Sequence, residues 1–139
     1  MIKFRKEWPL LIEIARANRL DYEESLLLLA LREIEAGRPG NEYNKPNVQN
    51  SNLGMQADSM ANQISKGEFI YQKYLKGGFE LLKLLPNEEP IAFVEFLGQH
   101  LMLNEGIRKD SKWIKSVEEV IQEIRKEFET ATKGENNAN

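Results

Sequence analysis

The sequence DYEESLLLLALREIEAGRPG, residues 21–40, contains the clearest helix signals of this chain. It begins with Asp21 and Glu24, spaced as in a capping box, in which two side chains satisfy free backbone N–H groups at a helix start. The apolar run Leu26–Leu31 follows, and Gly37 suits the position just beyond a helix end. The stretch therefore predicts a helix that begins after Asp21 and ends before Gly37.

Helical patterns continue on both sides of this stretch. Pro9 suits the first turn of an upstream helix, because its missing N–H has no helical partner there. The further expected helices are about Trp8–Asn18, Met55–Lys76, Ile91–Leu101 and Lys112–Phe128. Within the expected helix Met55–Lys76, Gly67 is expected to bend or break the helix. Neither a strand pattern nor an internal repeat is found, so we expect an all-α (mostly helical) domain of about five to six helices.

A long loop is expected after the second helix, over Gly37–Gly54. It contains two prolines and several asparagines, and loops of this length are often functional or flexible. The length of 139 residues fits one domain. We therefore expect a single domain over residues 1–132, with residues 133–139 (KGENNAN) as a disordered tail.

Composition excludes several classes of function. Hydrophobic residues make up 41% and charged residues 29%, as in ordinary globular proteins. The absence of cysteine excludes thiol catalysis and cysteine-ligated metal sites, and the single histidine excludes a multi-histidine metal site within one chain. No glycine pattern matches a phosphate-binding fingerprint either, and neither a metal nor an organic cofactor is expected.

Charge and hydropathy bear on partners and location. The formal net charge is −3, and the two signs are interleaved, which disfavours nucleic-acid binding. The longest apolar run has six residues, far below the roughly 20 of a membrane-spanning helix, so no membrane insertion is expected. The amino terminus has no convincing signal peptide, which predicts cytoplasmic synthesis. The oligomeric state is left open.

Two glutamates near the end of the second helix are candidates for acid chemistry. Glu33 and Glu35 point ~160° apart on a helix, so both cannot face one substrate. The negative end of the helix dipole and partial burial disfavour a carboxylate, and a carboxyl that stays protonated near neutral pH suits general acid catalysis. By spacing alone, both are better explained as ordinary surface glutamates at a solvated helix end.

Four stretches in order resemble lysozyme-like proteins encoded by phages and prophages, a group related to goose-type lysozymes and soluble lytic transglycosylases. They are ALREIEAGRPGNEY (30–43), QADSMANQI (56–64), FVEFLGQH (93–100) and WIKSV (113–117). The resemblance implies a lysozyme-like domain that cleaves the β-1,4 glycan strands of peptidoglycan. It implies that Glu35, and not Glu33, is the catalytic general acid, in a groove beside the long loop.

The resemblance also bears on the rest of the site. A second essential carboxylate is not required in transglycosylase-like members, so hydrolysis and transglycosylation both stay open. Tyr43, Glu42 and His100 are the candidate substrate-binding residues. Tyr43 is equally well explained by packing, and a lone helical histidine such as His100 is more often a packing or surface residue. Asp58 and Glu105, like Glu42, are candidates for a secondary polar role or are simply solvated charges.

The chain also departs from the pattern of that group. Asn44 and Lys45 stand where the group tends to have a glycine and a hydrophobic residue, and a tyrosine expected after FVEFLGQH is missing. These departures, with the acidic charge, favour an alternative: a non-catalytic lysozyme-like module with a phage structural or host-interaction role. An unrelated helical bundle that binds a protein partner is a third possibility. A wall-active protein would reach the wall by a holin-like route or inside a virion.

Overall fold

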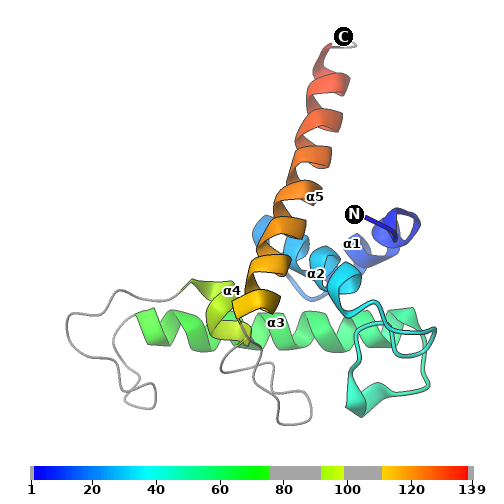
Figure 1. Cartoon of the computed structure of the whole chain (residues 1–139), viewed down its shortest axis with the longest axis vertical. Coiled ribbons are helices and arrows are strands. Elements are labelled where there is room, and N and C mark those ends of the chain that lie inside the picture. The colour runs from blue at the N-terminus through cyan, green and yellow to red at the C-terminus, as the bar shows by residue number, and fades with distance from the viewer. Residues whose placement is uncertain (1, 76–91, 99–110, 138–139) are drawn as a thin grey trace.

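The computed structural model describes residues 2–75, 92–98 and 111–137 (Figure 1). Their regular elements are helices, and none of the described residues forms a strand. In chain order they are η1 (Arg5–Glu7), α1 (Trp8–Ala17), α2 (Tyr22–Glu35), η2 (Pro46–Val48), α3 (Leu53–Leu75), α4 (Phe93–Phe96) and α5 (Ser111–Asn137). The predicted all-α, mostly helical class is confirmed.

Helix α2 begins and ends as its sequence predicts. Asp21 Oδ1 accepts a 2.8 Å hydrogen bond from the backbone N–H of Glu24, and Glu24 Oε1 accepts one of 2.9 Å from the N–H of Asp21. This is the predicted capping box. At the other end Ala36 adopts a left-handed conformation, with φ of 44°, and its N–H donates to the carbonyl oxygen of Arg32. The helix thus stops before Gly37, with the left-handed residue one position earlier.

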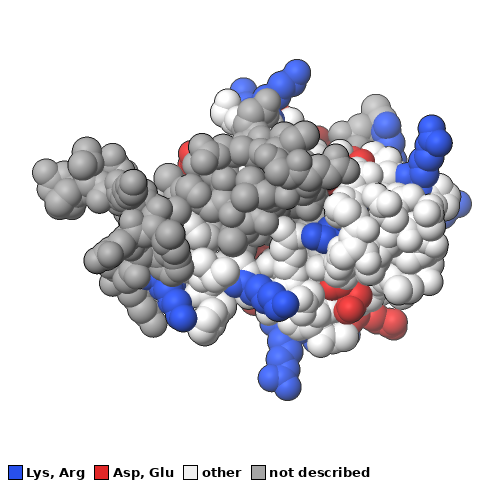
Figure 2. All heavy atoms as spheres, turned by 90° about the horizontal axis from the view of Figure 1, so that it is seen from below, with Lys and Arg blue, Asp and Glu red and all other residues white. Residues whose placement is uncertain are grey.

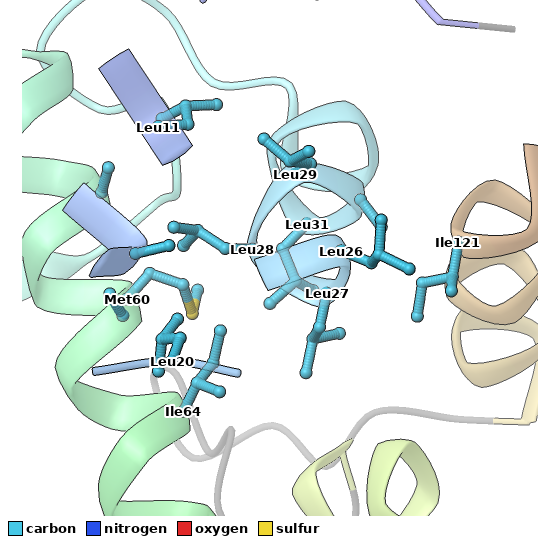
Figure 3. Close-up of a cluster of buried hydrophobic side chains, with 14 of the residues drawn as sticks. Leu11, Leu20, Leu26, Leu27, Leu28, Leu29, Leu31, Met60, Ile64 and Ile121 are labelled. Carbon is cyan, nitrogen blue, oxygen red and sulfur yellow. The ribbon is translucent and has the colours of Figure 1, made fainter. Parts of the chain in front are cut away.

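Helix α2 is the centre of the domain. Every residue from Leu26 to Arg32 is buried, and α2 packs against α1, α3 and α5. In Figure 3, Leu28 points toward Met60 of α3, and Leu26 points toward Ile121 of α5. A helix that is apolar on all sides is stable only when other elements enclose it, so the leucine run explains why α2 is central.

The other helices fit the predicted positions with differences at their ends. Gly67 does not interrupt α3; it is buried within a continuous helix. Helix α5 passes the expected end at Phe128 and reaches Asn137. Good helix formers such as Glu129 and Ala131 continue the helix past its last packed aromatic residue. The carboxyl-terminal part of α5 projects beyond the other helices (Figure 1).

The predicted helix at Ile91–Leu101 is seen only in part. Helical structure covers Phe93–Phe96 and continues through residues 97–98, and the remainder lies outside the described residues. On the face shown in Figure 2, the lysine and arginine side chains stand apart from one another, with some acidic side chains between them.

Candidate active site

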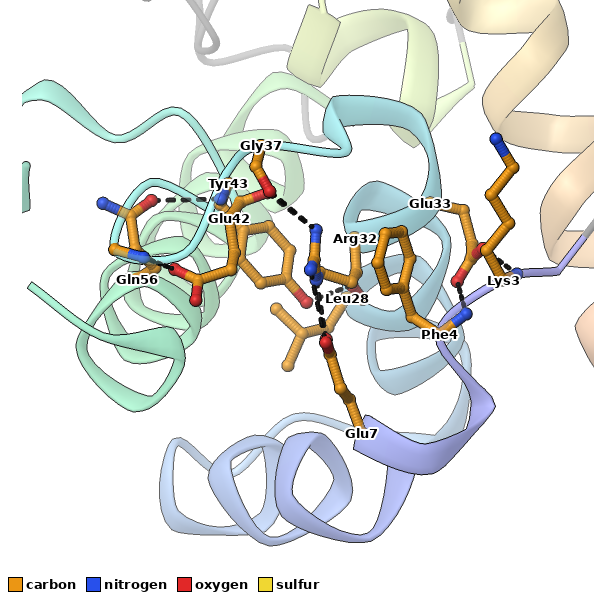
Figure 4. Close-up of polar contacts among 11 residues, drawn as sticks. Lys3, Phe4, Glu7, Leu28, Arg32, Glu33, Gly37, Glu42, Tyr43 and Gln56 are labelled. Carbon is orange, nitrogen blue, oxygen red and sulfur yellow. Dashed lines mark hydrogen bonds and ion pairs between the residues drawn. The ribbon is translucent and has the colours of Figure 1, made fainter.

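The loop after α2 is fixed to the end of that helix by Arg32, which is only 4% exposed. Its guanidinium donates to both carboxylate oxygens of Glu7, at 2.6 and 3.2 Å, and lies 3.6 Å from the centroid of the Phe4 ring. It also donates to the carbonyl oxygen of Glu42 at 3.4 Å. Arg32 therefore joins α2, the amino-terminal segment and the loop (Figure 4).

A second buried polar residue, Gln56, ties the same loop to α3. Its side chain is fully buried, and its Oε1 accepts from the backbone N–H groups of Tyr43 and Lys45, at 3.0 and 3.1 Å. Its Nε2 donates to the carbonyl oxygens of Lys45 and Val48, at 3.3 and 2.9 Å. One amide thus satisfies four backbone groups that loop burial would otherwise leave without partners.

The start of the loop requires a glycine. The N–H of Gly37 donates to the carbonyl oxygen of Glu42, and a Cβ at position 37 would lie 1.8 Å from the backbone oxygen of Asn41. No side chain can be accommodated there without moving the loop backbone. The close turn brings residues 41–44 back over the carboxyl-terminal end of α2.

Glu35 lies at that end, half-buried, and faces an open hollow of about 470 Å³. Its Oε1 atom is shielded from solvent. Its Oε2 atom accepts a 3.2 Å hydrogen bond from Asn44 Nδ2, which also donates to the backbone carbonyl oxygen of Glu35 at 3.1 Å. The residues that line the hollow are Glu35, Ala36, Gly37, Arg38, Asn41, Asn44 and Gln49.

Glu33, the other glutamate of this helix end, has a different task. Its two carboxylate oxygens accept from the backbone N–H groups of Lys3 and Phe4, at 2.5 and 3.1 Å. It anchors the amino-terminal segment on the side of α2 away from the loop (Figure 4). The predicted divergence of Glu33 and Glu35 is thus present in the structure, and only Glu35 lines the hollow.

Two of the predicted substrate-binding residues are buried within the loop and have structural partners. Tyr43 is fully buried, and its hydroxyl donates to the carbonyl oxygen of Leu28 at 2.7 Å, so its ring presents no face to a sugar. Burial also raises the pKa of the Tyr43 phenol well above its ordinary value, which keeps it a donor. Glu42 is 6% exposed and accepts from the N–H of Gly40. This placement disagrees with a direct sugar contact for either residue.

The remaining candidates lie elsewhere. His100 and Glu105 are outside the described residues. Asp58 is exposed and accepts a 2.8 Å hydrogen bond from Asn18 Nδ2, which connects α3 to α1 and is not part of the hollow.

Lys45 is an unusual neighbour of Glu35. It is 7% exposed, and its Nζ donates to Gln63 Oε1. Burial lowers the pKa of Lys45, and the negative charge of Glu35 opposes that effect. The two residues that depart from the pattern of the lysozyme-like group, Asn44 and Lys45, therefore both act on the environment of Glu35.

Three residues that shape the site were not predicted: Arg32, Gln56 and Asn44. A signal existed for two of them. Gln56 precedes Met60 by one helical repeat, on the apolar face of α3, and Arg32 follows Leu28 by the same spacing on α2. Asn44 stands in a loop without periodicity, and only the folded loop brings it to Glu35.

Within the described ranges, no cluster of three or more His, Cys, Asp or Glu residues is arranged to hold a metal ion. Among the same residues, no helix combines the length and apolarity that crossing a bilayer requires. Comparison of the chain with protein-family models, with curated proteins and with solved structures gives no match.

Proposed function

We propose that this protein cleaves the glycan strands of peptidoglycan, with Glu35 as general acid. The observation that carries the proposal is the position of Glu35: a half-buried carboxyl at the carboxyl end of the central helix, in an open hollow beside the long loop. A groove of this kind is what the lysozyme-like resemblance implies for Glu35, and a carboxyl in open solvent would have counted against it.

The chemistry needs one proton donor at the glycosidic oxygen. Glu35 gives its proton to that oxygen as the bond from the oxygen to the anomeric carbon breaks. The protonated sugar departs as an alcohol, and the anomeric carbon of the remaining sugar becomes an oxocarbenium-like centre. Water or the substrate's own 6-hydroxyl group then attacks that centre, either directly or after the N-acetyl oxygen has closed a transient oxazolinium ring. The attacking O–H group gives its proton back to the Glu35 carboxylate.

The lining of the hollow fits a sugar better than an apolar ligand. Arg38 and the amides of Asn41, Asn44 and Gln49 surround Glu35. Amide groups donate and accept hydrogen bonds, as the hydroxyl and acetamido groups of an amino sugar do. A hollow of about 470 Å³ also lies within the range usual for ligand sites.

A non-catalytic lysozyme-like module, with a phage structural or host-interaction role, is the second candidate. It is favoured by the burial of Tyr43 and Glu42, which removes two predicted substrate contacts, and by the polar groups that Asn44 and Lys45 add near Glu35. Such a module would keep the fold and the hollow without turnover.

The test is clearing of purified peptidoglycan suspensions, across roughly pH 5–8, by wild type, Glu35→Gln and Glu33→Gln. The proposal expects clearing by wild type and by Glu33→Gln, scaled to the folded fraction measured by circular dichroism, and none by Glu35→Gln. Glu33→Gln is the matched control, because it makes the same change two residues earlier on the same helix. Absence of clearing by folded wild type on several wall types would favour the non-catalytic module.

A further inference from the structure

The side-chain NH2 group of Asn44 makes two hydrogen bonds to one residue. Its Nδ2 donates both to the backbone carbonyl oxygen of Glu35, at 3.1 Å, and to Glu35 Oε2, at 3.2 Å. A bond to the carbonyl alone would only complete the end of α2. The second bond restrains the carboxyl group itself.

The backbone holds Asn44 where it can make both bonds. Its φ is 53°, in the left-handed region, which asparagine tolerates better than most residues. Its own N–H donates to the carbonyl oxygen of Asn41 at 2.9 Å, and the residues on either side of it, Tyr43 and Lys45, are fixed by Gln56. The amide is therefore presented to Glu35 by an anchored turn and not by a free loop.

We propose that Asn44 is the positioning residue of Glu35, whose amide fixes the carboxyl group in one orientation at the edge of the hollow. This inference rests on the proposed function of Glu35 as the acid. An acid must meet the glycosidic oxygen at hydrogen-bond distance, and misplacement of a reacting group by about 1 Å costs up to ~100-fold in rate. In wild type, Asn44 removes the rotamer freedom that would misplace the proton.

The structure supplies a matched control in Asn50. This residue is exposed, stands in the same loop and has a φ of 57°, but it does not line the hollow. Asn44→Gly and Asn50→Gly therefore make the same chemical change at the same backbone conformation, and only the first removes a contact with Glu35. Asn44→Asp is a further variant, since it keeps the shape of the side chain and loses the donor.

Two measurements test the inference. In peptidoglycan cleavage, Asn44→Gly and Asn44→Asp are expected to lower kcat by about 10- to 100-fold with KM little changed, while Asn50→Gly behaves as wild type. In NMR of the protein without peptidoglycan, the side-chain coupling constants of Glu35 are expected to report a single rotamer in wild type and in Asn50→Gly. In Asn44→Gly the coupling constants are expected to be averaged over several rotamers.

The outcomes separate this inference from the proposed function. An unchanged kcat in folded Asn44→Gly, or a rise in KM alone, would overturn the positioning role; the latter would make Asn44 a substrate contact. If wild type cleaves nothing, the proposed function fails, but the NMR coupling constants still show whether Asn44 fixes the orientation of the Glu35 carboxyl group. A single Glu35 rotamer in both wild type and Asn44→Gly overturns the inference, whatever the activity.

Discussion

The phenol of Tyr43 donates a 2.7 Å hydrogen bond to the carbonyl oxygen of Leu28, in the middle of the central helix. This hydrogen bond attaches the loop beside Glu35 to the core of the domain. Tyr43 therefore acts as an anchor of the loop and not as a wall of the site. The distinction can be measured, because an anchor and a sugar contact respond differently to the loss of the hydroxyl.

Tyr43→Phe removes that hydroxyl and leaves the ring. We expect a loss of about 1 kcal/mol in the free energy of unfolding, since one buried hydrogen bond is lost and the Leu28 carbonyl keeps its place in the helix. Cleavage kinetics of the folded protein should be unchanged. Denaturant unfolding and KM measured on the same preparation check both points, and a raised KM with wild-type stability would restore the sugar contact.

Glu7→Gln breaks the ion pair with Arg32. The Arg32 side chain is 5% exposed and the Glu7 side chain 26%, so we expect a loss of about 2–3 kcal/mol, somewhat below that for a fully buried pair. The exposed pair of Arg5 and Glu127 supplies the control. Glu127→Gln should cost under about 1 kcal/mol in urea unfolding. Equal effects of the two substitutions would show that the pair of Glu7 and Arg32 contributes no more than an exposed ion pair.

Gln56→Leu keeps the approximate volume of a buried side chain and removes four hydrogen bonds to the loop backbone. Because those backbone groups would stay buried without partners, we expect a loss of about 3 kcal/mol or more. Backbone amides of residues 43–48 should exchange with solvent faster than in wild type. Gln72→Leu, at an exposed position of α3, is the control and should leave the stability nearly unchanged. Loop amides that exchange as slowly in Gln56→Leu as in wild type would contradict this account.

The burial of Lys45 predicts how the stability of the fold changes with pH. Burial lowers its pKa in the folded state, so the unfolded chain holds the proton more tightly, and the buried charge costs stability at neutral pH. That cost disappears as pH rises through the folded pKa toward about 10.5. Lys45→Met should therefore be more stable than wild type at pH 7, with a difference that shrinks toward pH 10.5. A difference that grows with pH in thermal unfolding would contradict the assignment.

Much of the fold follows from local chemistry in the sequence. The capping box of Asp21 and Glu24 fixes the start of α2, because the groups that satisfy a helix end are its near neighbours in the chain. Gly37 marked the end of α2 to within one residue, since the left-handed residue there is Ala36. The leucine run between the two ends requires burial on all sides. The end of α5 was placed too early because Phe128 is the last apolar residue of its stripe, whereas α5 continues through the mostly polar residues that follow and through Gly134.

The site was less predictable, because its contacts join distant residues. Glu35 could be singled out by its place at a helix end and by resemblance. Tyr43 could not be assigned to core or surface, since a single aromatic residue in a loop has no periodicity that reveals its direction. The partnership of Asn44 with Glu35 depends on how Gly37 folds the loop back, which no local pattern encodes.

The most direct measurement of the central claim is mass analysis of the soluble fragments that wild type and Glu35→Gln release from purified peptidoglycan. The account predicts that wild type releases disaccharide fragments with new reducing or anhydro ends, and that folded Glu35→Gln releases none. Equal release of the same fragments by both proteins would contradict the role of Glu35, and no release by either would contradict glycan cleavage itself.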